Sequence, residues 1–262
     1  MAGILSLPEG RIADVIFFTS PRDACRLACV STTFKSTADS DVVWNRFLPP
    51  EYASSPRSSF SKKELYLCAC HNPVLINEGK LSFWLDKPTG KKCYMISARE
   101  LGISWVDNPL YWTWISLPEA RFPIVAELNR VCWFEINGTI NTSLMSPVIT
   151  YVAYLVFMRT QYFFGFDSSW DHRVEVTVGL TGSDGQKRTV YFHSDQGDIV
   201  SRDDHGRFPQ TRGDGWLESE LGEFFYGGDE KGELSISILG IHGGHWKGGL
   251  VVQGIEIRPK SE

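Results

Sequence analysis

Ile103-Ser-Trp-Val-Asp-Asn-Pro-Leu-Tyr-Trp-Thr-Trp114 is a stretch in which three indoles and a tyrosine surround an Asp-Asn-Pro turn. Asp and Asn side chains start turns, and proline fixes its own φ, so a tight turn is expected here. The rings after it alternate as in a strand, with Trp112 and Trp114 on one face and Tyr111 on the other. The rings either form the core of a β-sandwich or provide a stacking platform for a sugar. The stretch alone favours the core.

Composition and charge narrow the classes of function. The chain has 262 residues and a net charge of -5, which gives no general basic field for nucleic acid as the main ligand. The apolar run from Tyr151 to Met158 ends at Arg159 and is too short to cross a bilayer. No basic-then-apolar leader opens the sequence. We expect a protein of the cytoplasm and nucleus, with neither a membrane nor nucleic acid as a partner.

The six cysteines do not have the spacing of a disulfide framework. Most lie in the first half of the chain, which fits buried, reduced thiols. Cys68 and Cys70 are two positions apart on an expected helix and point in different directions, and no matching second pair follows. His242 and His245 lie in a glycine-rich turn without a third ligand nearby in sequence. We therefore expect no metal and no cofactor.

The first segment, residues 1–50, has helical periodicity, with breaks at Thr19-Ser-Pro21 and at Pro49-Pro50. Ser20 is expected to cap a helix that begins with proline. A segment with this number of helical residues buries little apolar surface by itself. We therefore expect Ile12 and Ile16 to belong to an exposed apolar stripe that another domain or a partner must cover. A linker with one short helix, residues 51–79, follows, and its helix opens with the capping-box pattern Ser61-Lys-Lys-Glu64.

This first segment resembles an F-box. The apolar positions of that family occur here in the same order, as Leu7-Pro-Glu9, Ile12 to Ile16, Pro21-Arg-Asp-Ala24, Leu27 to Val30, Phe34 and Val43-Trp44. The segment departs from the family in its short Thr19-Ser20 junction and in Ser31-Thr-Thr-Phe34, where many F-boxes carry Cys-Lys-x-Trp. The resemblance implies docking on the Skp adaptor of a cullin-based ubiquitin ligase, through Leu7, Pro8, Ile12 and Ile16. The alternative is a helical cap on the following domain.

Residues 80–262 are almost all short strands separated by turns. The expected strands are Leu81–Leu85, Cys93–Ser97, Val131–Ile136, Thr139–Ser143, Thr150–Met158, Arg173–Leu180, Thr189–His193, Gly215–Phe225, Leu234–Ile241 and Leu250–Arg258. Asn137-Gly138 is interpreted as a hairpin turn. No helix of useful length intervenes. The predicted fold class is α+β, a small helical F-box followed by an all-β sandwich of jelly-roll type.

Chemistry is sparse in this second domain. It has no phosphate loop, no nucleophile elbow and no His-Glu-x-x-His, so the common catalytic signatures are missing. Glu218 and Glu220 share a face of an expected strand, and Glu223 follows Gly222, where a strand can bulge. Paired carboxylates can serve as the acid and base of a glycosidase, or accept hydrogen bonds from sugar hydroxyls. They can equally belong to a polar outer face.

Several long sequence segments of this domain resemble the tobacco agglutinin (Nictaba) domain of plant phloem lectins. They are Leu101 to Trp114, Val125 to Leu128, Val131 to Trp133, Tyr151 to Phe157, Gly206 to Pro209, Gly213 to Glu218, Leu221 to Phe225 and Gly254 to Pro259. The resemblance implies binding of N-acetylglucosamine-containing or related N-glycans by Trp105, Trp112, Glu218 and Glu223. The basic run that serves such lectins as a nuclear signal is reduced here to Lys187-Arg188.

With the F-box before it, the chain resembles plant F-box proteins of the phloem protein two class. We predict the substrate-recognition subunit of a Skp-cullin-F-box ubiquitin ligase, which binds glycoproteins or free N-glycans and performs no covalent chemistry itself. One alternative is a glycan-binding stress protein whose F-box is vestigial. Another is a glycosidase that uses Glu218 and Glu223.

Overall fold

The computed structural model describes residues 9–49, 60–166, 173–182, 185–193, 208–229 and 232–260. Contacts divide the chain into two compact units, which we describe separately. The helical unit consists of the described residues up to Val74 together with Trp84–Lys92, and the β unit consists of Leu75–Phe83 and the described residues from Cys93 onward. The domain limits expected at residues 50 and 79 remain a prediction. None of the helices in the described ranges is long and apolar enough to span a membrane.

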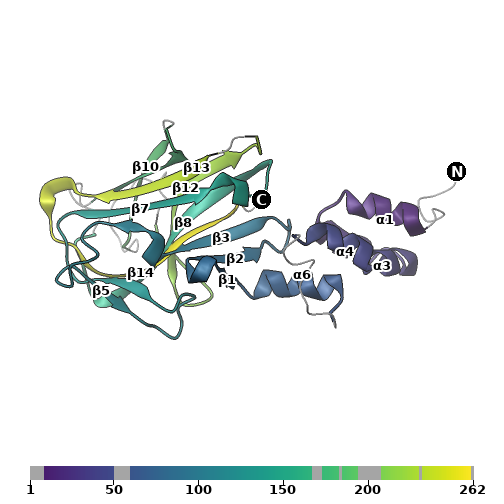
Figure 1. Cartoon of the computed structure of the whole chain (residues 1–262), viewed down its shortest axis with the longest axis horizontal. Helices are drawn as coiled ribbons and strands as arrows, with labels where there is room; N and C mark the ends of the chain where they lie inside the picture. The colour runs from purple at the N-terminus through teal and green to yellow at the C-terminus, as the bar shows by residue number, and fades with distance from the viewer. Residues whose placement is uncertain are drawn as a thin grey trace. The chain divides into compact units, whose positions relative to one another are not determined.

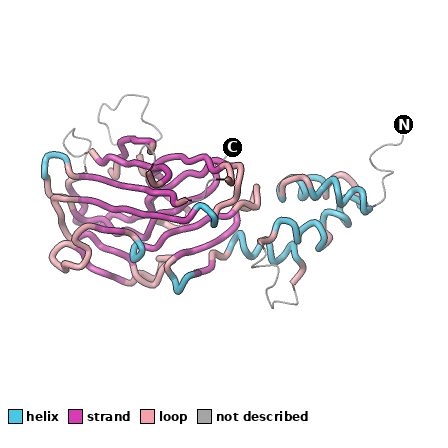
Figure 2. Tube along the Cα trace, turned by 45° about the horizontal axis from the view of Figure 1, so that its top comes forward, coloured by secondary structure: helices cyan, strands magenta, loops and turns pink. Residues whose placement is uncertain are grey.

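The helical unit contains the helices expected from the sequence, coloured cyan in Figure 2. They are α1 (Glu9–Phe17), α2 (Pro21–Leu27), α3 (Thr32–Ala38), α4 (Asp41–Phe47) and α6 (Lys62–His71). The cap expected before α2 is confirmed, because the Ser20 hydroxyl accepts a hydrogen bond from the Asp23 backbone N–H. The capping box of Ser61 and Glu64 at the start of α6 is also confirmed.

The inner face of α1 forms part of the core of the helical unit. Ile12 and Ile16, expected to form an exposed stripe, are 1% and 0% exposed. Helices α2, α3 and α4 pack against α1 and cover these side chains, so they are not on the surface of the unit. The apolar side chains that α1 and its C-terminal end leave in solvent are Val15 and Phe18, the latter 83% exposed. Leu7 and Pro8 lie outside the described residues.

The β unit is built around two antiparallel sheets (Figure 1). The larger has nine strands, in the order β1-β2-β3-β14-β8-β12-β11, with β6 paired to β14 and β5 paired to β6. Its strands are β1 (Val74–Ile76), β2 (Leu81–Leu85), β3 (Lys92–Ser97), β5 (Trp112–Ile115), β6 (Val125–Leu128), β8 (Ile149–Phe164), β11 (Gln210–Thr211), β12 (Leu217–Tyr226) and β14 (Gly248–Pro259). The predicted β-rich class is confirmed.

The smaller sheet has five strands, in the order β10-β9-β13-β7-β4. They are β4 (Gly102–Ile103), β7 (Phe134–Asn141), β9 (Val174–Leu180), β10 (Gln186–Val190) and β13 (Glu233–Gly240). Burial alternates strictly along β7 and β13, as expected when one face packs against a core and the other faces water. The core between the sheets is aromatic: the Phe192 ring lies 6.0 Å from Phe134 on β7 and 5.2 Å from Phe157 on β8.

The predicted hairpin turn at Asn137-Gly138 is wrong. Both residues lie inside β7, which runs without interruption and pairs with β13 along its whole length. Gly138 is needed for packing between the sheets, because a Cβ there would lie 3.0 Å from side-chain methyls of Ile255 and Leu101. An Asn-Gly pair therefore marks a close approach here, which the local sequence does not distinguish from a turn.

The expectation of buried cysteines is also wrong in part. All six thiols are free, but Cys25, Cys29 and Cys132 are exposed, while Cys93 is buried. Cys25 lies on α2, but Cys29 lies in the turn after this helix ends at Leu27, and both thiols are exposed to solvent. A spacing of four residues predicts a shared face only while the helix continues, and it does not say what covers that face.

We expect Gly138→Val to destabilise the β unit by about 1 to 3 kcal/mol, because the added methyls would be forced against Ile255 and Leu101. Thermal unfolding of the variant measures the effect. Gly213→Val is the matched control, since a Cβ at Gly213 meets nothing within 4 Å. Equal melting temperatures for the two variants would contradict this account of Gly138.

Candidate functional site

Trp112, expected at a sugar site, belongs to the core. Its side chain is 2% exposed, its ring stacks on Phe134 at a centroid distance of 6.4 Å, and its indole N–H donates to the backbone oxygen of Ser104 at 3.1 Å. Neither face of this indole is open to a sugar. Trp112 instead holds the segment just before Trp105, so it supports the other predicted tryptophan.

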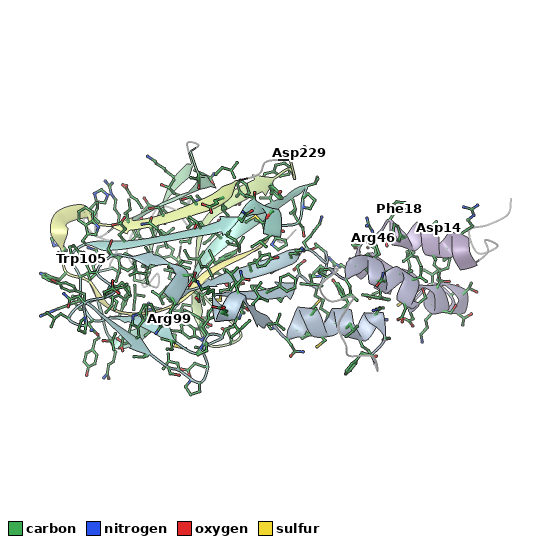
Figure 3. The ribbon with its side chains drawn as sticks, in the orientation of Figure 1. Asp14, Phe18, Arg46, Arg99, Trp105 and Asp229 are labelled. Carbon is green, nitrogen blue, oxygen red and sulfur yellow. The ribbon has the colours of Figure 1, made fainter. Side chains whose placement is uncertain are left out.

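Trp105 is the exposed indole of the opening stretch (Figure 3). It lies in the loop after β4, its side chain is 59% exposed, and Tyr111 packs edge-on against its ring at 6.2 Å. Its φ is +68°, in the left-handed region that a bulky side chain rarely adopts. Such strained positions gather at functional sites, where the surrounding structure holds them in place. The loop thus keeps a large indole in solvent at a cost in free energy.

One carboxylate joins this loop to a second exposed indole. Glu135 on β7 accepts hydrogen bonds at 2.8 Å from the Ser104 hydroxyl and from the indole N–H of Trp133, and at 3.1 Å from the Asn137 amide. These hydrogen bonds lower the pKa of Glu135, with the largest effect from Trp133, so its carboxylate is ionised at neutral pH. Trp133 is 46% exposed. We call Trp105, Trp133, Glu135 and Asn137, with Ser104, the Glu135 cluster.

The outer face of the five-stranded sheet continues this polar surface. Asn137 on β7 lies opposite Ser237 on β13, and Ser237 lies opposite Thr177 on β9. All three positions face away from the core in the burial pattern of their strands. A row of amide and hydroxyl groups therefore extends across the sheet from the Glu135 cluster.

Sequence reasoning missed Trp133 and Glu135 as site residues. The signal was present, because Trp133-x-Glu135-x-Asn137 has the alternation that places its side chains on one face of a strand. The wrong turn at Asn137-Gly138 concealed it, since a strand that ended at Ile136 separated Asn137 from Glu135.

Glu218 lies in a network of ion pairs on the nine-stranded sheet. Its oxygens accept hydrogen bonds from Arg258 at 2.6 and 2.8 Å and from Arg212 at 2.7 Å. Burial by itself would raise the pKa of Glu218, but the hydrogen bonds and charges of the two arginines outweigh it and lower the pKa. The buried Glu256 pairs with the same two arginines. Glu218 therefore serves mainly to neutralise two partly buried guanidinium groups.

Glu223 and Glu220 are also paired. The Lys260 ammonium lies 2.7 Å from Glu223 at the surface, and the Arg188 guanidinium lies 2.7 Å from Glu220. The register of β12 against β8 shifts between Glu220 and Gly222, so the bulge expected beside Gly222 is present. Every carboxylate of β12 thus has a cationic partner. Glu135 bonds Ser104, the residue before Trp105, whereas Glu218 and Glu223 form ion pairs.

The fold and the site describe a protein with a small helical unit and a β-sandwich that presents indoles beside an ionised carboxylate. The family profile described as Phloem protein 2 matches residues 91–259. Relatives from Arabidopsis thaliana match nearly the whole chain. Putative F-box protein PP2-B12 is 47% identical over 98% of both chains. F-box protein PP2-B10 is 45% identical over 97% of this chain and 93% of its own. F-box protein SKIP3 is 40% identical over 97% of this chain and 87% of its own. The chain belongs to the phloem protein 2 family.

Solved structures are far more distant. A family 35 carbohydrate binding module from Clostridium thermocellum aligns with a TM-score of 0.34 and 12% identity, over 63% of this chain and 96% of that one. A similarity at this level supports no inference about the ligand of the present chain. The family assignment therefore depends on the sequence relatives, and the site depends on the geometry of the chain itself.

The two predicted carboxylates should respond very differently to neutralisation. We expect Glu218→Gln to destabilise the β unit by about 3 kcal/mol, at the low end for breaking a buried ion pair, because Glu256 still pairs both arginines. That loss corresponds to a fall of roughly 6 to 12 °C in melting temperature. Glu223→Gln, the matched control, removes an exposed pair and should cost about 0 to 1 kcal/mol. Calorimetry of both variants decides between the roles.

The stability difference between wild type and Glu218→Gln should depend on pH in a defined direction. The pKa of Glu218 is lowered by folding from its ordinary value of 4.5. Its stabilising contribution is therefore complete above that value and is lost as the pH falls through the lower pKa of the folded state. The gap between wild type and Glu218→Gln should close as the pH falls below 4.5. A gap that persists unchanged in strong acid would contradict the ion-pair account.

Proposed function

We propose that this chain is the substrate-recognition subunit of a Skp-cullin-F-box ubiquitin ligase, and that its β unit binds N-acetylglucosamine-containing or related N-glycans on target glycoproteins. The observation that carries the glycan part is the Glu135 cluster, with two exposed indoles beside an ionised carboxylate. The names of the relatives, which describe F-box proteins, support the ligase part.

The chemistry of the Glu135 cluster suits a sugar. Indole faces pack against the apolar C–H face of a pyranose, and nearby polar groups fix its hydroxyls. A carboxylate offers about four lone-pair positions, and three internal donors occupy Glu135, so one remains for a sugar hydroxyl. The Asn137 amide and the row through Ser237 and Thr177 provide donors and acceptors for further sugar residues. Trp105 thus stays in the proposed site, and Trp112 supports it from the core.

The ion pairs of β12 do not favour the glycosidase alternative. A general acid must keep its proton near neutral pH, which requires a raised pKa. The pKa of Glu218 is lowered, and its oxygens are directed to Arg212 and Arg258. Glu218 therefore has the wrong protonation state for that role. Binding without cleavage is the function that this arrangement supports best.

The partner surface of the helical unit also follows from burial. Ile12 and Ile16 are inside the unit, so an adaptor contacts them only through a large rearrangement. Val15 on α1 and Phe18, the residue after α1, are exposed and apolar, which is typical of side chains that a partner covers. We assign Val15 and Phe18 to the Skp contact, together with Leu7 and Pro8, which lie outside the described residues.

Glycan binding should depend on the indoles of the Glu135 cluster. We expect Trp105→Ala and Trp133→Ala each to remove about 1 to 3 kcal/mol of binding free energy, with little change in melting temperature. Binding to N-acetylglucosamine oligomers and N-glycans is measured on a glycan array with the full chain. Trp246→Ala, an exposed indole outside the cluster, is the matched control. Retained binding by both cluster variants would remove this surface from the proposal.

Adaptor binding should depend on the exposed side of α1. We expect Val15→Asp with Phe18→Asp to abolish co-purification with the Skp adaptor while the chain keeps its melting temperature, because both side chains are at the surface. Phe60→Asp, which changes an exposed phenylalanine outside α1 to α4, is the control and should bind normally. Ile12→Asp with Ile16→Asp should instead unfold the helical unit. Normal adaptor binding by the Val15 and Phe18 variant would count against the docking surface.

A further inference from the structure

A pocket with a volume of about 420 Å³ lies within the helical unit. It is lined by α2 and the turn that follows this helix, by α4 and α6, and by the turn between β2 and β3, which belongs to the same unit. The volume is within the range of small-molecule sites in proteins. None of the lining residues contributes to the Glu135 cluster or to the proposed Skp contact.

The aromatic floor of the pocket uses its polar groups internally. The Trp44 indole N–H donates to the backbone oxygen of Ala38 at 2.6 Å, and the Tyr66 hydroxyl donates to the backbone oxygen of Lys87 at 3.0 Å. Each of the two rings is 1% exposed. Burial raises the pKa of Tyr66, so its hydroxyl keeps its proton and remains a donor. This hydrogen bond fixes the turn that carries Lys87 against α6.

The walls of the pocket that solvent reaches are apolar. Cys25, Cys29 and Pro88 are exposed, and Leu67 is half-buried. A free thiol behaves as a small hydrophobic group with weak hydrogen bonding. That of Cys29 lies 3.6 Å from the backbone oxygen of Cys25. A concave apolar surface releases water when a hydrocarbon group enters it, so it favours a ligand with an apolar body.

Cationic side chains also line the pocket. Arg22 and Arg26 on α2 and Lys87 on the turn are exposed, and none of the described lining residues is a carboxylate. Within the described ranges, neither Arg22 nor Lys87 forms an ion pair with a carboxylate, and the Lys87 ammonium lies 3.3 Å from the His71 ring. The Arg22 backbone N–H donates to the backbone oxygen of Pro88 at 3.3 Å, so the elements that carry the two cations are bonded to each other.

The carboxylates next to these cations in sequence are engaged elsewhere. Asp23 pairs with Arg26 at 3.1 Å and accepts a hydrogen bond from the Ser20 hydroxyl at 2.8 Å. Asp86 accepts hydrogen bonds from the backbone N–H and the hydroxyl of Thr89 inside the turn. The positive charge of the lining is therefore only partly neutralised in the part of the chain that the structure describes, which favours a ligand with a negative group.

We propose that this pocket binds a small apolar monocarboxylic acid. The hydrocarbon part of the ligand packs on Cys25, Leu67 and Pro88, and its carboxylate accepts charge-assisted hydrogen bonds from Arg22 and Lys87. A matching amide keeps the apolar contacts and loses the ionic ones, whereas a matching amine meets like charges. The inference is independent of the proposed ligase and glycan functions.

The first test is calorimetric titration of the full chain with 4-phenylbutyrate and octanoate, beside the corresponding amides and amines and beside acetate. We expect saturable binding of at least one of the two acids. The matching amide and amine should bind roughly tenfold more weakly or worse, because the ionic contacts are lost. Acetate should not saturate, because it lacks the apolar body. An amide or amine that binds as tightly as its acid, or no saturation by either acid up to about 10 mM, would overturn the proposal.

A pair of substitutions separates the ionic contacts from the apolar ones. Arg22→Gln with Lys87→Gln should weaken binding of the acid by roughly tenfold or more and leave binding of the amide within about twofold of wild type. Both side chains are exposed, so the melting temperature should not change. Arg11→Gln with Lys35→Gln is the matched control, since it removes the same charge from exposed positions of α1 and α3. Undiminished acid binding by the first pair, or an equal loss in the control, would contradict the assignment.

The thiols of the pocket report its occupancy without any substitution. Iodoacetamide alkylates exposed cysteines, and mass spectrometry of peptides gives the rate at each one. A saturating acid should slow alkylation of Cys25 and Cys29 several-fold and leave Cys132, an exposed thiol of the β unit, unchanged. Unchanged rates at Cys25 and Cys29, or equal slowing at Cys132, would place the ligand outside this pocket and overturn the proposal.

Discussion

The packing of two antiparallel sheets face to face is the constraint on which the rest of the β unit depends. It requires each strand to alternate between a side chain for the core and a side chain for the outer face. On β7 that alternation sends Phe134, Ile136 and Gly138 inward and Glu135 and Asn137 outward. The core that fixes the strand thereby also fixes the carboxylate of the Glu135 cluster. A shift of one residue in register would bury Glu135 and expose Phe134.

The carboxylates of the β unit differ in whether their hydrogen-bond partners are charged or neutral. Glu218 and Glu256 neutralise arginines that the nine-stranded sheet partly buries, so their charge is used by the fold. Glu135 is ionised because neutral donors hydrogen-bond to it, and in the part of the chain that the structure describes no cation forms an ion pair with it. A carboxylate held by neutral donors keeps its field available to a ligand, whereas one between two guanidinium groups does not. That difference separates a binding group from a structural one.

The helical unit shows the same relation between burial and function. The apolar positions on which the family resemblance depends include Ile12 and Ile16, and both side chains form part of the core. The residues available to a partner are those that the core does not need, such as Phe18 and Val15. In a unit this small, a helix face that serves the core has no surface left for a second protein.

The sequence by itself determined the β-rich class, most strand positions and the family. It also determined the caps at Ser20 and Ser61 and the bulge beside Gly222. Alternation, capping residues and short sequence motifs are local signals, so they can be read without the tertiary structure. Only the tertiary structure decided which indole is exposed and which carboxylates are paired. Trp105 and Trp112 are close in sequence, yet the opposing sheet buries one and leaves the other in solvent. Glu218 meets Arg258 across a gap of forty positions. Local sequence determines on which face of a strand or helix a side chain lies. The segments that pack against that face then determine whether the side chain is buried, paired or available to a ligand.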